Sequence, residues 1–247
     1  MANALAVEPH ASAAETASGS ATAVDIGALR SCLKLRLDLT ALSGTAPKLT
    51  VYVETASASS GPWKSLGAFP ALTVAATKDA VFADCLRYNR VRWALDGTGP
   101  SATFTVAGNA HVLYAKVADL GEHGVAKAAL ANISDSDKAK HCLAATDEAD
   151  GYLAGGKTLP LTAWSDDLTS KVAEIAAYKA LKVRGFQPES SDELIVKGRD
   201  DAISWLKGIA RGEIDPPGLV DSTPEVYESG ISVYSNAPTN SGGSYWP

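Results

Sequence analysis

Cysteine is scarce in this sequence of 247 residues, and its three occurrences are far apart. Cys32, Cys85 and Cys142 are too few and too scattered for a disulfide framework. None belongs to a Cys-x-x-Cys pair, the spacing typical of zinc or redox sites. Cysteine usage therefore indicates a reducing, intracellular origin.

Positive charge is also limited. The chain carries 22 Lys and Arg against 28 Asp and Glu, a net charge of −6 with a pI near 5.2. Proteins that hold nucleic acid through its phosphates need clustered basic residues, so direct DNA binding is disfavoured. An acidic surface can still line a path for DNA, because like charges repel and the polyanion passes without adhering.

Long apolar runs are missing. Residues 1–24 contain no Lys or Arg and no continuous apolar core, which excludes a typical signal peptide. No stretch is long enough in apolar residues to span a bilayer. We expect a soluble protein.

Catalytic motifs are missing as well: there is no Gly-rich phosphate loop, no His-Glu-x-x-His and no Gly-x-Ser-x-Gly. Ser31 and Lys34 match Ser-x-x-Lys, but residues three apart on a strand lie on opposite faces. His141 and Cys142 are neighbours, and neighbours on a helix point about 100° apart. The four histidines fall at no metal-ligand spacing. We expect no enzyme, no catalytic residue, no cofactor and no metal.

Two pairs of adjacent carboxylates are the remaining candidates for acid–base chemistry. Both pairs are predicted to lie at helix starts or on solvated helix faces, where acidic residues are common. A structural role is therefore favoured for Asp166, Asp167, Asp200 and Asp201.

Residues 28–110 show the period of half-buried strands. Leu33, Leu35, Leu37 and Leu39 alternate with polar residues, and the pattern returns at Leu49. Further strands are expected up to residue 107, the last two joined as a hairpin by residues 96–100, with a bulge near residues 89–90. Six short strands without a helical pattern predict an antiparallel β-sandwich, jelly-roll-like, as the N-terminal domain.

The period changes to that of helices in residues 111–214. Ser134 begins a capping pattern, and apolar residues then recur at helical spacing up to Gly155. Two further helices open at Ser165 and Ser190, and a broken helical piece over residues 117–130 precedes all three. The fold class is thus α+β in two domains, the second a small helical bundle.

Both ends differ from these domains. Residues 1–27 are rich in Ala, Ser and Thr and predict a flexible N-terminal arm. Residues 215–247 are rich in Pro, Ser, Asn and Gly, and predict an extended C-terminal arm with spaced apolar anchors for a partner protein. The partner-binding residues predicted there are Val226, Tyr227, Ile231, Val233, Tyr234, Tyr245 and Trp246.

Five short blocks, in order, carry a family resemblance. They are Tyr114-Ala115 with Asp119-Leu120, Ala149-Asp150-Gly151-Tyr152-Leu153, Leu159-Pro160-Leu161, Leu168 through Tyr178, and Asp200 through Gly212. With these blocks the helical half resembles the head-tail connector family of tailed bacteriophages, typified by the Mu-like head-completion proteins. Lys157-Thr158 stand where relatives usually have Arg-Tyr, which puts a contact of that Arg in doubt.

The resemblance implies a structural virion protein at the head–tail interface, made in the host cytoplasm. Its subunits would form a ring, by this resemblance a dodecamer, under the portal protein. That ring would extend the DNA channel and present a surface to a stopper or tail-terminator protein, while DNA passes without specific binding. No membrane is involved.

Two other hypotheses remain open. In one, the sandwich is a binding or decoration module that recognises a glycan or a capsid surface, with the helices as a mount. Its aromatic candidates are Tyr52, Trp63 and Tyr88, which could stack on sugars, although a Trp in a sandwich is more often part of the core. The other is an enzyme, for which Ser31 and Cys142 are the residues to substitute in a hydrolase screen.

Overall fold

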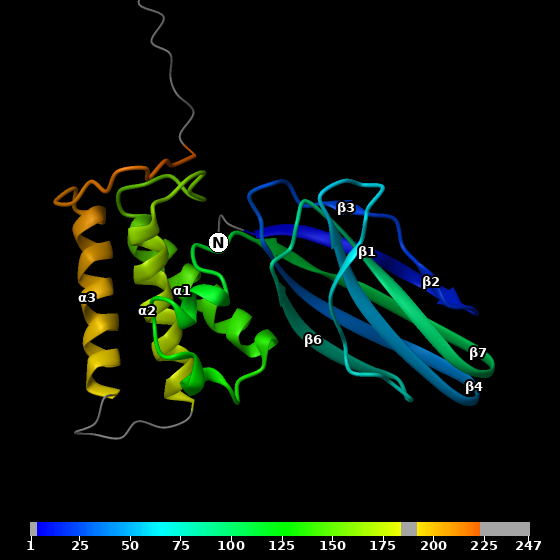
Figure 1. Ribbon diagram of the computed structural model, residues 1–247. Coiled ribbons are helices and arrows are strands. Elements are labelled where there is room, and N and C mark those ends of the chain that lie inside the picture. Colours follow the sequence, from blue (N-terminus) through cyan, green and yellow to red (C-terminus); the bar gives the residue numbers. More distant parts are fainter. Residues whose placement is uncertain (1–3, 184–191, 223–247) are drawn as a thin grey trace, which may run out of the picture.

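The computed structural model describes residues 4–183 and 192–222, and consists of an N-terminal antiparallel sheet followed by three α-helices (Figure 1). The class is α+β, as the sequence predicts. The seven strands are β1 (Ala4–Glu15), β2 (Gly19–Ser20), β3 (Val24–Asp25), β4 (Cys32–Ala56), β5 (Lys64–Ala68), β6 (Ala76–Ala83) and β7 (Tyr88–His111).

Two long strands, β4 and β7, lie at the centre of the sheet. They pair along almost their whole length, from Cys32 opposite His111 to Ala56 opposite Tyr88. Three register shifts interrupt the pairing between Leu39 and Lys48. Such bulges bend a strand pair and increase its twist. Figure 1 shows the ribbon turning back on itself at the end away from the helices.

The bent ribbon encloses one hydrophobic core. The apolar side chains of both of its halves belong to a single cluster, for example Leu35 in the first half of β4 and Val51 in the second. The alternation over residues 33–39 is confirmed, since the leucines are buried and the polar residues between them are exposed. The jelly-roll-like sandwich that the sequence predicts is not established by this strand arrangement. The strands make one antiparallel sheet that is not closed.

The prediction of a flexible arm over residues 1–27 is wrong for the part that the structure describes. β1, β2 and β3 all pair with β7. His10 of β1 is buried, stacked on Phe104 with a ring-centroid distance of 4.3 Å and edge-on to Trp93 at 4.8 Å. Pairing with β7 and the burial of His10 hold this segment on the sheet, which composition alone does not reveal.

The predicted hairpin over residues 96–100 is also wrong. Its two flanking segments belong to one strand, β7, and both pair with β4 instead of with each other. Gly97 does have a positive φ of 115°, but it lies at the bend of the long ribbon. The predicted bulge at residues 89–90 is absent from the β4–β7 register, which runs without a shift from Leu49 to Ala56.

The helical half contains α1 (Asp135–Leu153), α2 (Asp166–Lys182) and α3 (Asp192–Ala210), preceded by two short 3-10 helices, η1 (Ala118–Gly121) and η2 (Lys127–Leu130). The cap predicted at Ser134 is confirmed, because its hydroxyl accepts a hydrogen bond from the Asp137 amide at 3.1 Å. Fully buried residues from all three α-helices form one core, among them Cys142, Val172 and Leu206.

The two halves of the chain share packing. Cys32 and Val81 of the sheet belong to the hydrophobic cluster of the helices. The Val81 amide donates to Ser136 Oγ, in the first turn of α1, at 3.4 Å. α1 therefore contacts the edge strand β6.

Residues 213–222 return over the helices. The amide of Val220 donates to the Ala163 carbonyl at 2.9 Å, and the Thr162 amide donates to the Val220 carbonyl at 2.8 Å. Ile214 and Leu219 pack against the helical core. The first residues of the predicted C-terminal arm are thus part of the folded helical unit. The seven predicted partner-binding residues, Val226 to Trp246, lie outside the described residues.

Candidate assembly surface

The residues weighed for catalysis do not form a constellation in the part of the chain that the structure describes. Cys142 is fully buried, and burial raises the pKa of its thiol. His141 beside it is partly buried, and burial lowers the pKa of its imidazole. Lys34 is exposed on β4. Across residues 4–183 and 192–222, no group of three His, Cys, Asp or Glu side chains could hold a metal ion.

The paired carboxylates are exposed, as predicted. Asp166 and Asp167 occupy the first turn of α2, where the positive end of the helix dipole favours them. Asp200 is ion-paired with Arg199 at 2.8 Å on the surface of α3.

A buried tyrosine joins the start of the helical unit to two later segments. The Tyr114 hydroxyl donates to Asp150 Oδ1 of α1 at 2.5 Å and accepts a hydrogen bond from the Leu161 amide at 3.5 Å. Its ring meets Trp164 edge-on with a centroid distance of 5.0 Å. Burial, followed by the hydrogen bond to Asp150, raises the pKa of Tyr114, so the phenol stays protonated.

Two further contacts join the end of α1 to α3. Lys207 of α3 lies over the ring of Tyr152, with its Nζ 5.4 Å from the ring centroid. Gly156, just after α1, approaches the backbone of Ala210 so closely that a Cβ would lie 2.7 Å from the Ala210 carbonyl oxygen. The blocks recognised in the sequence are therefore contacts that assemble the three helices.

The outer face of α3 presents positive charge in a shallow hollow of about 380 Å³. Arg199, Lys207 and Arg211 line it together with Asp200 and Tyr152. Arg199 is ion-paired with Asp200, and Arg211 with Glu213 at 2.9 Å. Arg199 also reaches Glu148 of α1, at 3.8 Å. Despite the acidic net charge, one face of the helical unit thus carries basic side chains that a partner protein could contact.

The outer face of the sheet carries a second polar cluster. Glu54 of β4 accepts hydrogen bonds from Arg90 at 2.9 Å and from Arg92 at 2.8 Å, both on β7. The Arg90 guanidinium covers the ring of Trp63 at 4.3 Å, and the Arg92 guanidinium covers Tyr52 at 4.2 Å. Burial raises the pKa of Glu54, but the two arginine hydrogen bonds outweigh it and the pKa is lowered overall.

The sequence reasoning identified two aromatic residues of this cluster, Tyr52 and Trp63, but missed its charged centre. Trp63 is partly exposed on the outer face and is not a core residue, whereas Trp93 is buried. Opposite charges at outward positions of two strands indicate a cross-strand ion pair. The pair could be recognised only with the β4–β7 register, which brings Glu54 opposite Arg90.

Residues 114–232 match the family model described as Bacteriophage Mu, Gp36. The matched segment begins at the buried Tyr114 and covers just under half of the chain, including all three α-helices. The helical half is thus similar to a phage protein family. The sheet lies outside the match.

A solved structure titled "Crystal structure of PirA" matches 43% of this chain and 90% of its own, at 16% identity and a TM-score of 0.24. A TM-score this low carries no argument. No curated protein matches the chain. None of the helices in the described ranges is long and apolar enough to cross a membrane.

Proposed function

We propose that this chain is a structural virion protein, a head–tail connector or adaptor. In this proposal, copies of the chain form a ring beneath the portal protein, extend the DNA channel and offer a surface to the next neck or tail protein. The helical unit lies in the ring and the sheet projects from it. The protein has no catalytic role.

One observation carries the proposal: the family match covers residues 114–232, and this range contains all three α-helices of the helical unit. The Tyr114 junction and the Tyr152–Lys207 contact use blocks of the resemblance to fix the helices to one another. A family defined by such contacts shares a scaffold, and a scaffold with exposed charged faces is suited to assembly.

The net charge of −6 is consistent with a channel wall that DNA passes without adhering. The hollow on α3 is the local exception, because Lys207 lies there beside two arginines, Arg199 and Arg211, which are themselves ion-paired with Asp200 and Glu213. Charge complementarity of this kind steers protein partners together, so we assign this face to a contact with an acidic surface of a neighbouring protein.

The test uses capture of the portal protein by the full chain and by two truncated chains. Truncation after Ser222 removes residues 223–247, the larger part of the predicted arm, but keeps the Val220 contacts to Ala163. We expect this chain to stay folded and to lose portal capture. Truncation after Gly212 is the control for fold damage, because it also removes Ile214 and Leu219 from the helical core.

Electron microscopy of the intact particle supplies the second arm of the test. A ring of this chain between portal and tail is the expected result. Density elsewhere in the particle, or a particle that lacks the chain, would contradict the connector role whatever the truncations show.

A second candidate function follows from the outer face of the sheet. Tyr52 and Trp63 are side chains of a type that stacks on sugars. They lie on the outer face, where each ring has one side covered by an arginine that is bonded to Glu54. A binding or decoration module that recognises a glycan or a capsid surface would use this face. Glycan-array binding by the full chain that is lost in Trp63→Ala would favour it, and an array without signal would remove the glycan reading.

A further inference from the structure

One face of the sheet concentrates arginine and aromatic side chains. The second half of β4 pairs there with the first half of β7, and the register places Tyr52 opposite Arg92 and Glu54 opposite Arg90. Residues directly opposite in a sheet share a face, so these four side chains belong to one surface. Trp63 lies on it too, since its ring centroid is 4.3 Å from Cζ of Arg90. These five residues are called the arginine patch below.

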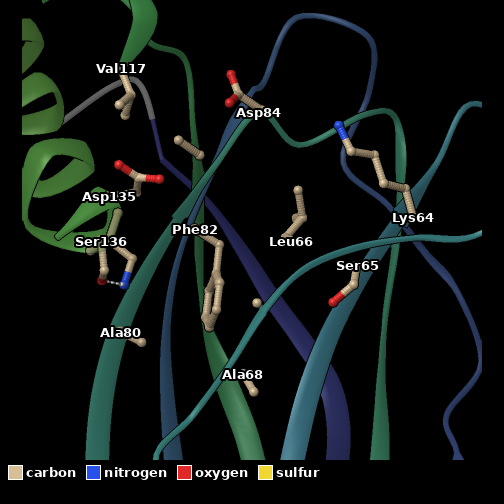
Figure 2. Close-up of a pocket in the computed structure, with 13 residues that line it drawn as sticks. Lys64, Ser65, Leu66, Ala68, Ala80, Phe82, Asp84, Val117, Asp135 and Ser136 are labelled. Carbon is tan, nitrogen blue, oxygen red and sulfur yellow. Dashed lines mark hydrogen bonds between the residues drawn. The ribbon is translucent and has the colours of Figure 1, made fainter. Parts of the chain in front are cut away.

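The position of Trp63 is set by the strand that follows it. β5 begins at the next residue and is hydrogen-bonded to β4. Figure 2 shows Phe82 of β6 and Leu66 of β5 lining the same groove. A Cβ on Gly67 would lie 3.4 Å from the Phe82 ring, so β5 also packs on this ring. Trp63 therefore approaches Arg90 from a strand that is paired on one side and packed on the other.

The arginine patch holds more positive than negative charge. Glu54 is the one carboxylate among its five residues and is only 8% exposed. Burial raises the pKa of Glu54, but the hydrogen bonds from Arg92 and Arg90 lower it overall, so the group is ionised at pH 7. Two guanidinium groups and one carboxylate leave one excess positive charge, on a chain whose net charge is −6.

The two arginines bind Glu54 in different ways. Arg90 places both Nε and Nη2 at 2.9 Å from Glu54 Oε2, and its side chain is 24% exposed. Arg92 binds Oε1 through Nε, and its side chain is 43% exposed. Within residues 4–183 and 192–222, the Nη1 and Nη2 atoms of Arg92 have no hydrogen-bond partner. The Nη1–Nη2 edge of this guanidinium is therefore free to bind a ligand.

Arg92 is held in place before any ligand arrives. Its Cζ lies 4.2 Å from the ring centroid of Tyr52, and its Nε is bonded to Glu54. A flexible arginine loses rotamer freedom when a ligand fixes it, and much of that loss has already occurred here. The free edge of a fixed guanidinium matches the two oxygens of a carboxylate, which it binds with two parallel hydrogen bonds.

The composition of the arginine patch favours a protein as the ligand. Nucleic acid needs several phosphate contacts, and one excess charge on an acidic chain does not supply them. Sugar stacking needs open ring faces, and an arginine already covers one side of both Tyr52 and Trp63. A protein carboxylate needs only the free edge of Arg92. Arginine, tryptophan and tyrosine are also the residues enriched at the energetic centres of protein interfaces.

We propose that the arginine patch docks an acidic segment of a partner protein, with one Asp or Glu carboxylate of the partner bound to the Nη1–Nη2 edge of Arg92. Side chains next to that carboxylate pack on Tyr52 and Trp63. This inference rests on the second candidate function, a binding module that uses this face, and names an acidic protein surface as its ligand. It does not depend on a ring beneath the portal.

The test measures binding of labelled poly-L-glutamate to the full chain by fluorescence anisotropy at low salt. Arg92→Gln removes the guanidinium, while Arg90 keeps Glu54 paired, so the variant should remain folded by circular dichroism. Arg92→Lys keeps the charge but lacks the planar fork. Arg36→Gln is the matched control, because it changes the net charge equally and Arg36 already has Nε and Nη2 bound to Asp79.

We expect Arg92→Gln to weaken binding about tenfold or more, and Arg92→Lys about threefold to tenfold, because an ammonium group cannot form the paired bonds. Arg36→Gln should change the Kd by less than about twofold, as expected for an exposed pair. Absence of binding by the parent, equal losses in Arg92→Gln and Arg36→Gln, or no loss in Arg92→Lys would overturn the proposal. So would binding that is lost in Lys207→Gln but kept in Arg92→Gln, because it would lie on the α3 hollow.

Competition distinguishes other occupants of the arginine patch. Heparin or a single-stranded oligonucleotide that binds more tightly than poly-L-glutamate, with the same dependence on Arg92, would replace the acidic protein by a sulfated glycan or a nucleic acid. Self-association of the parent that is lost in Arg92→Gln, measured by sedimentation, would replace the separate partner by a second copy of this chain. Each of these results contradicts the proposal.

The inference and the proposed functions fail separately. A ring in particles, without binding of poly-L-glutamate, leaves the connector role intact and removes the Arg92 site. Binding that depends on Arg92, in a chain found away from the neck, supports the site and contradicts the connector role. A glycan-array signal without binding of poly-L-glutamate keeps the second candidate function and overturns the acidic protein as its ligand.

Discussion

The hydroxyl of Tyr114 donates a hydrogen bond to Oδ1 of Asp150, 36 positions further along the chain, at 2.5 Å. Tyr114 lies three positions after His111, the last residue of β7, and Asp150 lies in the last turns of α1. This contact fixes the point where the helical unit begins to the helix at its centre. It is also where the family match starts.

Replacing Tyr114 by Phe removes the hydroxyl that donates to the partly buried Asp150 and accepts from the Leu161 amide. We expect the free energy of unfolding to fall by about 1–3 kcal/mol. For a chain of this size that corresponds to a decrease in Tm of about 2–4 °C per kcal/mol. Thermal unfolding followed by circular dichroism measures it.

Tyr52→Phe is the matched control, because the Tyr52 ring lies on the outer face of the sheet under Arg92. Its Tm should stay within about 1 °C of the parent, as expected for a substitution away from buried polar groups. Equal losses in the two variants would show that the Tyr114 bond has no special role in joining the segments.

Acid sensitivity should centre on Glu54. Its pKa is lowered in the folded protein, so the unfolded chain binds more protons near pH 4, and stability increases with pH there. The stabilisation is fully present above the unfolded pKa of about 4.3 and is lost as the pH falls through the folded pKa. Glu54→Gln should therefore lower the Tm at pH 7 and have a diminishing effect at lower pH.

At pH 7 we expect a cost of about 1.5–3 kcal/mol for Glu54→Gln, the range for hydrogen bonds to charged groups. Glu8→Gln, an exposed residue of β1, is the control and should leave the Tm against pH curve nearly unchanged. A Glu54→Gln curve parallel to that of the parent down to pH 3 would remove Glu54 as the source of the acid sensitivity.

Local patterns predicted much of this fold, for reasons visible in particular residues. Leu33 to Leu39 alternate because one face of β4 is buried, and Ser134 caps α1 with its own hydroxyl. Both signals are contained within a few residues. Asp96-Gly97 was a misleading local signal, because pairing with β4 keeps the flanking segments in one strand.

The N-terminal strands and the polar contacts depended on distant partners. Nothing near His10 in sequence indicates that it stacks on Phe104, more than ninety positions away. Glu54 and Arg90 are recognised as a pair only once the register of β4 and β7 is known. The helical blocks were visible as a resemblance, but the contacts of Tyr114 with Asp150 and Leu161 required the three-dimensional arrangement.

The three thiols should be unreactive in the folded protein. Cys32, Cys85 and Cys142 are buried, and burial raises the pKa of Cys85 to about 12. A thiolate is the reactive form, so a thiol reagent at pH 8 should modify all three only after denaturation in guanidinium chloride. Rapid reaction of one thiol in the folded protein would contradict this and would reopen Cys142 as a nucleophile.

Two glycines should respond in opposite directions to replacement by alanine. Gly108 lies in β7 between β1 and β4, where a Cβ would clash with the backbone carbonyl oxygen of Lys34. Strand backbones cannot move apart there without loss of pairing, so Gly108→Ala should cost about 1–3 kcal/mol. Gly151 is exposed in α1, and a Cβ there meets nothing within 4 Å.

For Gly151→Ala we expect a gain of about 0.5–1 kcal/mol, because alanine loses less backbone entropy than glycine on entering a helix. Denaturant unfolding of the two variants beside the parent measures both effects, and an unchanged m-value would show that the unfolded states are comparable. Gly151 also belongs to a block of the resemblance, so the variant separates two roles. If Gly151→Ala is more stable yet fails to capture the portal protein, the bare backbone at this position serves an interface and not the helix.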